Sequence, residues 1–290
     1  MGPAEKTPPD ASGWAWLVDQ AIAEDLGPGD LTSELTIPAD ARCQARIEAR
    51  APIVACGLFL ASEVFRRISP EVEFKARVHE GEAAATARRL ADLEGPARAI
   101  LAAERTALNF LGRLSGVATF TRRYVDAVEG TGADIVDTRK TIPGWRVLDK
   151  FAVLCGGGVN HRQALFDGIL LKDNHIAAAG GVEPAVRAAI AGAPEGIRVQ
   201  VEVESLEQAL EACDAGADFL LLDNRSPSEI VRMREALAGR AVLEASGGIT
   251  LENVRAYAKT GVDRISIGAL THSAPCADVA LEIDAMVDRP

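Results

Sequence analysis

Charged and polar residues follow six short apolar runs in the second half of the chain. The first two runs end in Asp137-Thr138-Arg139-Lys140 and Lys172-Asp173-Asn174-His175. The other four end in carboxylates, an amide, serines and glycines, at 202–204, 223–224, 246–248 and 266–268. Arginine clamps a carboxylate with two hydrogen bonds, lysine supplies a point charge, and carboxylates can hold a divalent cation. These residue types therefore indicate a site for an anionic substrate.

The third apolar run places two carboxylates on one face of a strand. In VQVEVES, Glu202 and Glu204 alternate with valines and share their face with Gln200. Burying a carboxylate is costly unless it is paired. We expect both to point into the interior of the fold and to be paired with Lys172, Arg139 or a bound metal. An ion pair without a catalytic role is the alternative.

Glycines follow the last two apolar runs. Gly247 and Gly248 come after the fifth run, and Ile267-Gly268-Ala269 overlaps the end of the sixth. Glycine lets backbone N–H groups approach an anion closely, and a following helix N-terminus adds partial positive charge. The placement predicts a phosphate cradle, with ordinary tight turns as the alternative.

Cations are concentrated near these strand ends in a chain that is otherwise acidic. Arg139, Lys140, Arg162 and Lys172 all flank the predicted ends, although the whole chain carries a formal net charge of −11. This is more positive charge than one phosphate requires, so a substrate with several carboxylates, or with a carboxylate and a pyrophosphate, fits. His161 precedes Arg162 after a triple-glycine loop and is expected to contact the same ligand.

Alternating strands and helices must position these residues. Strands are predicted at 134–137, 168–171, 198–203, 219–222, 241–245 and 264–267. Helices are predicted between them at 145–154, 184–191, 206–215, 228–238 and 251–260. Apolar strands that alternate with helices form a parallel sheet, and active sites of βα barrels lie at the carboxyl ends of the strands. Six such units predict a βα barrel that is short of eight strands.

The first part of the chain has a different pattern of predicted elements, without the regular alternation of strands and helices. Strands are predicted at 42–50 and 72–78, helices at 14–23, 58–68, 96–114 and 117–128, and mostly loop at 24–38. The predicted fold class is therefore α/β, with an N-terminal α/β open-sheet sandwich domain and a C-terminal incomplete (β/α) TIM-like barrel. The expected divisions are a disordered leader at 1–13, the sandwich at 14–115 joined by 277–290, and the catalytic barrel at 116–276.

Composition argues against several classes of protein. The 290 residues are 48% hydrophobic and 25% charged, as in ordinary globular chains. A net acidic chain argues against nucleic acid and anionic membranes as partners, and no apolar run reaches the ~18 residues of a membrane span. The N-terminus lacks a secretory pattern. Scattered cysteines predict buried free thiols in a reducing cytoplasm: Cys43, Cys56, Cys155, Cys213 and Cys276.

Eight stretches, in order along nearly the whole chain, resemble the quinolinate phosphoribosyltransferase family (nicotinate-nucleotide pyrophosphorylase, carboxylating). They are AERTALNFLGRLSG, DTRKTIPGWR, GGGVNHR, LLKDNHI, VEVES, LLLDN, EASGGI and SIGALTHS. DTRKT, GGGVNHR and KDNH are specific to this family and its near relatives. The resemblance implies a sandwich domain, an incomplete barrel, and a homo-oligomer, a dimer or a hexamer, in which one subunit's first domain closes over its neighbour's barrel.

The resemblance also implies roles for the site residues. Quinolinate would be bound by Arg105, Thr138, Arg139, His161, Arg162 and Lys172. Phosphoribosyl pyrophosphate would be bound by Lys140, Glu202, Asp223, Ser246, Gly247, Gly248, Ile267, Gly268 and Ala269. Glu202 and Asp223 would hold Mg²⁺, directly or indirectly, and Lys140 and Lys172 complete the expected catalytic set. Arg105 would reach the neighbouring subunit's site, whereas its own context indicates only a solvent-facing helical residue.

The implied reaction transfers a phosphoribosyl group to quinolinate with decarboxylation. Its products are nicotinate mononucleotide, pyrophosphate and carbon dioxide, in de novo NAD biosynthesis. Three other functions stay open. A Schiff-base aldolase would use Lys172 as its nucleophile. A relative of the same fold, such as the molybdenum-associated pyrophosphorylase-like proteins, would use another base. A non-catalytic anion-binding protein would leave the two carboxylates unexplained.

Overall fold

The computed structural model describes residues 6–287, which form two compact units. Unit 1 holds the residues up to Arg122, Ile142–Gly157, and those from Ser273 onward, whereas unit 2 holds Arg123–Thr141 and Gly158–His272. Unit 1 contains an antiparallel sheet with helices, and unit 2 contains a parallel, barrel-like sheet. The predicted fold class is therefore confirmed, and the expected domain bounds stay a prediction.

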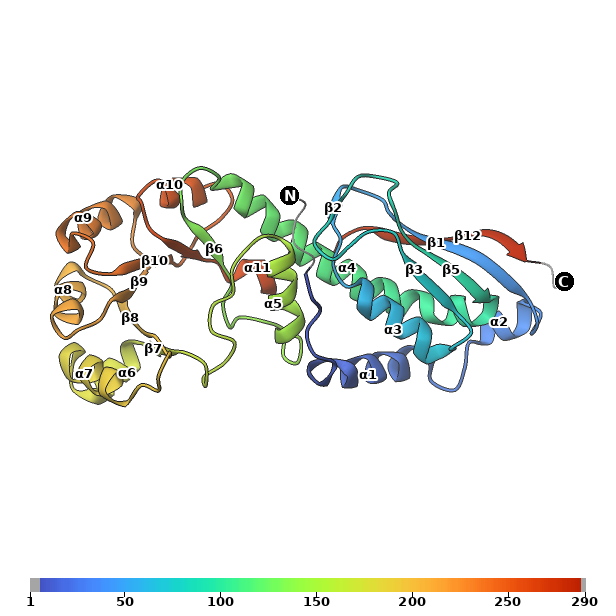
Figure 1. Ribbon diagram of the computed structural model, residues 1–290, viewed down its shortest axis with the longest axis horizontal. Coiled ribbons are helices and arrows are strands. Elements are labelled where there is room, and N and C mark those ends of the chain that lie inside the picture. The colour runs from blue at the N-terminus through green and yellow to red at the C-terminus, as the bar shows by residue number, and fades with distance from the viewer. Residues whose placement is uncertain (1–5, 288–290) are drawn as a thin grey trace. The chain divides into compact units, whose positions relative to one another are not determined.

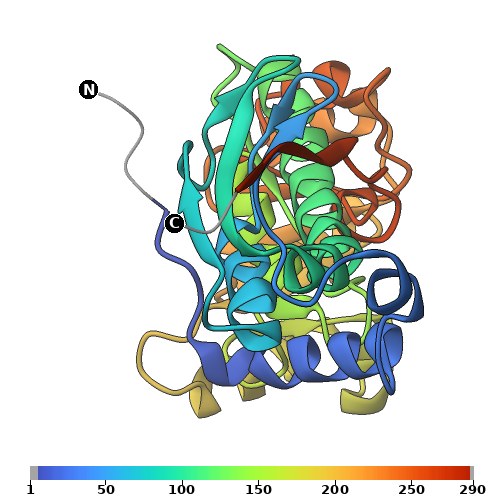
Figure 2. The same ribbon diagram turned by 90° about the vertical axis from the view of Figure 1, so that its right-hand side faces the viewer.

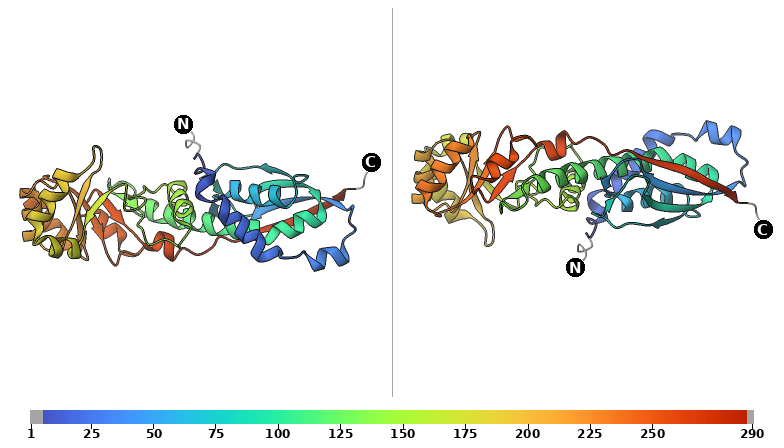
Figure 3. Two further views of the ribbon diagram at one scale, coloured as in Figure 1. Left: turned by 90° about the horizontal axis from the view of Figure 1, so that it is seen from below. Right: turned by 90° about the horizontal axis from the view of Figure 1, so that it is seen from above.

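A four-stranded antiparallel sheet forms the core of unit 1. Its strands follow the order β12, β1, β5, β3, with bounds Val279–Val287, Arg42–Ala49, Arg89–Pro96 and Glu73–Ala76. In β1, Cys43, Ala45, Ile47 and Ala49 are buried, as their period of two requires, and the alternate residues are more exposed. The last strand, β12, pairs with β1 across the whole length of β1 (Figure 3).

Helices bury the apolar face of this sheet. Figure 2 shows the long helix α4 running along one face of the strands. The helix α3 turns five side chains inward at the spacing of one helical face: Leu58, Leu60, Ala61, Val64 and Phe65. The remaining elements of unit 1 are η1 Ala11–Gly13, α1 Ala15–Leu26, α2 Leu31–Thr36, β2 Ile53–Val54, α3 Leu58–Ile68, β4 Ala83–Ala84, α4 Ala97–Ala127 and α5 Arg146–Cys155.

Two predictions for unit 1 are wrong. Helix α4 is continuous, although separate helices were expected on either side of Gly116. Gly116 does not break the helix; it lets the chain at Pro275 pass close by, because a Cβ atom there would lie 2.1 Å from the Pro275 carbonyl oxygen. The expected loop at 24–38 contains α2, whose N-terminus is capped by Asp30 through a 3.1 Å hydrogen bond from Ser33 N.

The close approach at Gly116 predicts a large effect on stability. Gly116→Ala should lower the free energy of unfolding by about 2–3 kcal/mol, because the obstructing atoms belong to the backbone and cannot rotate away. Urea denaturation followed by circular dichroism measures this change. Gly192→Ala is the control, since a Cβ atom there meets nothing within 4 Å. If both variants unfold at the wild-type midpoint, the contact is absent in solution.

Unit 2 is a parallel sheet of six strands that does not close. The order is β6, β11, β10, β9, β8, β7, so β6 and β7 are adjacent in sequence but lie at opposite edges. This order is that of a barrel with its seam open between the first two strands. The strand bounds are Asp134–Val136 for β6, Ile169–Leu171 for β7, Val199–Val203 for β8, Phe219–Asp223 for β9, Val242–Ser246 for β10 and Arg264–Ser266 for β11.

Helices lie on the outer side of these strands (Figure 1). The five helices expected from residue 145 onward are all present, the first of them as α5 of unit 1, and two short helices directly after strands were missed. The helix bounds in unit 2 are α6 Asp173–Ala179, α7 Val182–Gly192, α8 Leu206–Asp214, α9 Pro227–Leu237, α10 Val254–Ala258 and α11 Ala269–His272.

The remaining sequence expectations have mixed outcomes. The leader at 1–13 lies partly outside the described residues, which begin at 6, and its residues Ala11–Gly13 form a 3-10 helix. The five cysteines are free, but only three are buried: Cys213 is half-buried and Cys276 is exposed in the segment before β12. Among residues 6–287, no helix is both long and apolar enough to cross a membrane.

Candidate active site

The carboxyl ends of the strands in unit 2 surround a cavity of about 200 Å³. Nine of the predicted site residues line it: Thr138, Arg139, Lys140, His161, Arg162, Lys172, Glu202, Asp223 and Ser246. Leu170, Leu221, Glu244 and Ser266 complete the lining. The parallel strand directions bring these ends to one face, so residues more than a hundred positions apart in sequence share one cavity.

Two arginines in the cavity lie close enough to repel each other. Burial lowers the pKa of the Arg162 guanidinium, and the positive charge of Arg139 lowers it further. Arg139 Nε is buried and has no hydrogen-bond partner within residues 6–287. A buried donor without a partner, beside a second cation, is costly unless an anion binds there. The pair is therefore suited to a ligand that carries more than one negative charge.

Lys172 and Glu202 form an ion pair in the same cavity. Lys172 Nζ donates a hydrogen bond to Glu202 Oε2 at 2.8 Å, so the structure supplies the cation that the strand pattern required for this carboxylate. The Glu202 side chain is 11% exposed and that of Lys172 is 47% exposed. Because its Nζ is already hydrogen-bonded to this carboxylate, Lys172 is better placed to contact an anionic ligand than to attack a carbonyl.

A buried carboxylate holds the loop that carries His161 and Arg162. Asp137 is fully buried at the end of β6. Its two oxygens accept hydrogen bonds from Asn160 Nδ2 at 2.5 Å and from His161 N at 2.9 Å. The Arg162 N–H donates to His161 Nδ1 at 2.7 Å, which places the proton of the neutral ring on Nε2, 2.8 Å from Gln200 Oε1. The imidazole is thus fixed in one orientation at the cavity wall.

The role of Asp137 leads to a prediction about substrate binding. In Asp137→Asn an amide N–H group replaces one acceptor, so one of the two loop contacts is lost. Hydrogen bonds to charged groups are worth about 1.5–3 kcal/mol. We therefore expect kcat/KM to fall by roughly 10- to 100-fold. Steady-state kinetics measures this, and Asp134→Asn, at an exposed position where β6 begins, should match the wild type. Equal kinetics for both variants would show that Asp137 does not position the loop.

Glu244 lines the cavity and Gln200 contacts the cavity residue His161, and neither was among the predicted site residues. Glu244 is fully buried on β10, with Arg264 Nε 3.2 Å from Oε2 and His161 Nε2 3.6 Å from Oε1. Gln200 is also buried and contacts His161. The strand period could have identified Glu244 from the sequence. It lies two residues before Ser246 and therefore shares the same face of the strand.

The predicted phosphate-binding turns lie beside Lys140. A Cβ atom on Gly268 would lie 3.0 Å from Lys140 Cδ, so glycine lets this side chain pass over the turn. Thr271 Oγ1 donates to the Lys140 carbonyl oxygen at 2.8 Å, which joins the two segments. Gly247 adopts a φ of +96°, and its missing side chain makes room for Asn224. Gly248 faces open space, where an anion could approach the backbone.

Several predicted residues lie away from the cavity wall. Ile267 is buried beneath it, and Ala269 begins α11. Arg105 is exposed on the part of α4 that belongs to unit 1. Glu204 does not point inward as expected; it is exposed, because β8 ends at Val203 and the chain turns away toward α8.

The donor set fits Mg²⁺. Glu202 and Asp223 are half-buried carboxylates on the adjacent strands β8 and β9. Mg²⁺ prefers oxygen ligands and usually takes one or two carboxylates together with water and substrate phosphates. Both side chains line the cavity beside Lys140, so a metal held there would lie among groups suited to a phosphorylated substrate.

This combination of fold and site defines a class of protein: an enzyme with an incomplete parallel α/β barrel that binds anionic substrates at the carboxyl ends of its strands. Residues 30–115 match the family model "Quinolinate phosphoribosyl transferase, N-terminal domain". Residues 117–282 match "Quinolinate phosphoribosyl transferase, C-terminal domain". The chain belongs to the quinolinate phosphoribosyltransferase family, as its motifs predicted.

Named relatives resemble the chain over most of its length. It is 43% identical to nicotinate-nucleotide pyrophosphorylase [carboxylating] of Mycobacterium leprae, over 92% of this chain and 95% of the relative. It is 40% identical to the probable enzyme of the same name of Bacillus subtilis, over 92% of each. The solved nicotinate-nucleotide pyrophosphorylase of Francisella tularensis superposes with a TM-score of 0.91 at 37% identity, over 98% of this chain and 100% of that one.

Proposed function

We propose that the chain transfers the phosphoribosyl group of 5-phosphoribosyl 1-pyrophosphate to quinolinate with loss of carbon dioxide, giving nicotinate mononucleotide and pyrophosphate. The relatives' names support this decarboxylating pentosyltransferase activity, which belongs to de novo NAD biosynthesis. One structural observation carries the proposal: a single cavity holds two arginines and two lysines beside three carboxylates. Neither an aldolase nor a simple anion-binding protein needs this combination.

Quinolinate fits the cationic side of the cavity. Its two carboxylates would be bound by Arg139 and Arg162, whose mutual repulsion an anion relieves, and by Lys172. Thr138 and the fixed imidazole of His161 lie on the same wall and would orient the ring. Holding the pyridine nitrogen toward the ribosyl carbon makes the reaction effectively unimolecular, which supplies a large part of the rate.

Phosphoribosyl pyrophosphate fits the other side. The turns at Gly247 and Gly248 and at Ile267, Gly268 and Ala269 would bind its phosphates through backbone N–H groups, together with Ser246. Lys140, beside Gly268, would bind the leaving pyrophosphate. Glu202 and Asp223 would hold the ribose hydroxyls and Mg²⁺. When bound, Mg²⁺ would offset the negative charge of the pyrophosphate.

Residues of the chain would stabilise each charge that develops during the reaction. As the bond from the ribosyl carbon to pyrophosphate breaks, positive charge develops on the sugar, and Glu202 and Asp223 stabilise it while Lys140 stabilises the departing anion. The pyridine nitrogen donates its electron pair to the ribosyl carbon. The resulting pyridinium draws electrons from the bond to the adjacent carboxylate, which leaves as carbon dioxide, and a proton takes its place.

Formation of a homo-oligomer, a dimer or a hexamer, is part of the proposal. Leu165 and Phe166, three and four residues after Arg162, are 72% and 82% exposed, and exposed apolar side chains of this size favour a protein partner. Arg105 would reach the active site of the neighbouring subunit. Mixing Arg105→Ala with Lys172→Met subunits tests this, because random dimers of two inactive parents would regain about a quarter of the intact sites. No recovery after subunit exchange would contradict a shared site.

A single assay tests the proposed activity. The purified chain is incubated with quinolinate, phosphoribosyl pyrophosphate and Mg²⁺, and nicotinate mononucleotide is detected by ultraviolet absorbance. Nicotinate replaces quinolinate as the control, since it lacks one of the two carboxylates that the arginines would bind. Product from quinolinate alone supports the proposal, and product from nicotinate or no product at all contradicts it.

A cytoplasmic location, also proposed, is supported by the free cysteines.

A further inference from the structure

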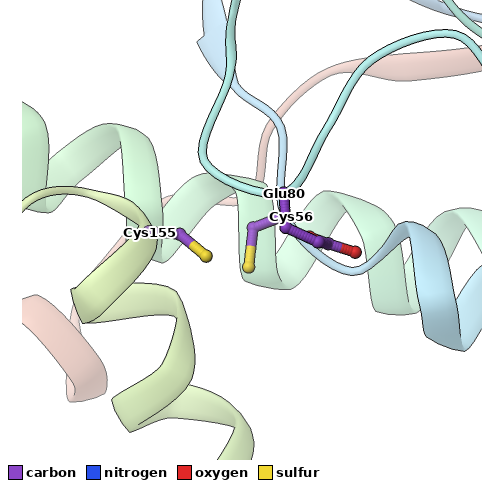
Figure 4. A group of neighbouring side chains, drawn as sticks. All are labelled: Cys56, Glu80 and Cys155. Atoms are coloured by element: carbon purple, nitrogen blue, oxygen red, sulfur yellow. The ribbon is translucent and has the colours of Figure 1, made fainter. Parts of the chain in front are cut away.

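A second cluster of reactive side chains lies in unit 1, apart from the cavity of unit 2. Cys56 precedes α3, Glu80 lies in the turn between β3 and β4, and Cys155 is the last residue of α5. One donor atom from each, the two Sγ atoms and a carboxylate oxygen, lie within 4.8 Å of one another. Figure 4 shows the two sulfur atoms facing each other. Among residues 6–287, no other such group of three cysteine, histidine or acidic side chains occurs.

The cluster is buried and carries potential negative charge. Cys56 and Cys155 are 0% and 2% exposed. Glu80 accepts hydrogen bonds from Gly57 N at 2.8 Å and Phe59 N at 3.1 Å, so its carboxylate stabilises the N-terminus of α3. The two sulfurs would bind a metal as thiolates, and a divalent cation would balance their charge beside this carboxylate.

We propose that Cys56, Glu80 and Cys155 form a structural zinc site. Zn²⁺ binds thiolate sulfur at about 2.3 Å and carboxylate oxygen at about 2.0–2.2 Å, and two sulfurs of a tetrahedral site lie about 3.8 Å apart. A separation within 4.8 Å is thus closed by a small side-chain adjustment. The second Glu80 oxygen or a water completes four ligands. Each thiol releases its proton when the metal–sulfur bond forms, and no redox step is involved.

The surroundings suit this cation rather than Mg²⁺. Two sulfur ligands favour a thiophilic ion, whereas Mg²⁺ takes oxygen ligands in an octahedron. Cys155 lies at the C-terminus of α5, where the backbone carbonyls favour positive charge. The ion would join three segments of unit 1 that are distant in sequence and would fix the end of α5, from which the chain continues to the loop of His161.

Metal uptake by the full chain tests the site without reference to its activity. The chain is unfolded under reducing conditions with a chelator, and is then refolded in Mg²⁺ buffer with one equivalent of Zn²⁺ or Cd²⁺. Desalted protein is analysed for bound metal, and the cadmium–thiolate charge-transfer absorption is recorded. We expect one ion per chain and a thermal unfolding midpoint that is several degrees above that of the metal-free protein.

Matched cysteine variants locate the ligands. Cys56→Ser and Cys155→Ser should each reduce uptake to roughly a tenth and remove the absorption. Cys43→Ser, which also removes a buried thiol, and Cys213→Ser should retain both. Failure of the wild-type chain to bind either ion overturns the proposal, and so does uptake that survives in either ligand variant. Because no substrate is used, these results are separable from the test of phosphoribosyl transfer.

Discussion

Replacing Arg139 by alanine should lower kcat/KM for quinolinate by roughly 10²- to 10³-fold. Losing one partner of a buried, hydrogen-bonded charge pair costs about 2–5 kcal/mol, and Arg139 is a half-buried cation that would meet a substrate carboxylate. Its Nε has no hydrogen-bond partner within residues 6–287, so the substitution removes no hydrogen bond at that atom. Steady-state rates of nicotinate mononucleotide formation measure the loss, and thermal unfolding should show a midpoint at or above that of the wild type.

Two further substitutions show whether charge or geometry is responsible. Arg139→Lys keeps the positive charge but not the planar pair of donors, so it should recover only part of the activity. Arg187→Ala, at an exposed ion pair with Glu183 on α7, should behave as the wild type. Wild-type kcat/KM in Arg139→Ala would remove the basis for assigning the cationic side of the cavity to quinolinate.

Replacing Lys172 by methionine should reduce kcat/KM on the order of 10³-fold. The side chain of Glu202 is 11% exposed, and its partner Nζ lies 2.8 Å away, so the substitution leaves a largely buried carboxylate unpaired in the cavity. Truncating one partner of such a pair costs about 2–5 kcal/mol. The unpaired carboxylate would also repel an anionic substrate. Initial rates over a range of quinolinate concentrations separate the effects on KM and kcat.

The ion pair gives this prediction an internal control. In the double variant Lys172→Met with Glu202→Gln, the loss should be smaller than the product of the single losses, because each single change already breaks the pair. Borohydride in the presence of substrate should leave Lys172 unmodified, since the proposed phosphoribosyl transfer forms no Schiff base. A covalent adduct on Lys172, or full activity in Lys172→Met, would favour the aldolase.

The periodic parts of the fold could be predicted from the sequence alone. The alternation in β1 and in VQVEVES, and the six apolar runs separated by helical segments, follow from which face each side chain must bury. The effect of Gly116 on the helix could not be predicted from the local sequence. The residue that requires a glycine there, Pro275, lies more than 150 positions later in the chain. Helix α2 was not predicted because the glycines and prolines around it indicated a loop, although Asp30 is a good N-cap.

The site was predictable where a strand fixes the direction of its side chains. Glu202 and Ser246 point inward with their strands, and Glu244 would have followed from the same period. Glu204 was mispredicted because periodicity does not reveal where a strand ends. The proposed position of Arg105 in a neighbouring active site would depend on the arrangement of subunits, which no local pattern encodes.

The open seam of the barrel has a consequence for how such enzymes diversify. Between β6 and β7 the chain at Val159 takes the place of a missing strand, with its N–H bonded to the Ile135 carbonyl at 2.8 Å and a parallel bridge to Val136. The backbone of the segment that presents His161 and Arg162 thus bridges to β6, whereas the His161 side chain contacts Gln200 on β8. Residues 163–167 belong to no strand, so we expect insertions or exchanges there to leave the pairing of β7 with β8 intact. Ligand preference could then change during evolution while the sheet stays the same.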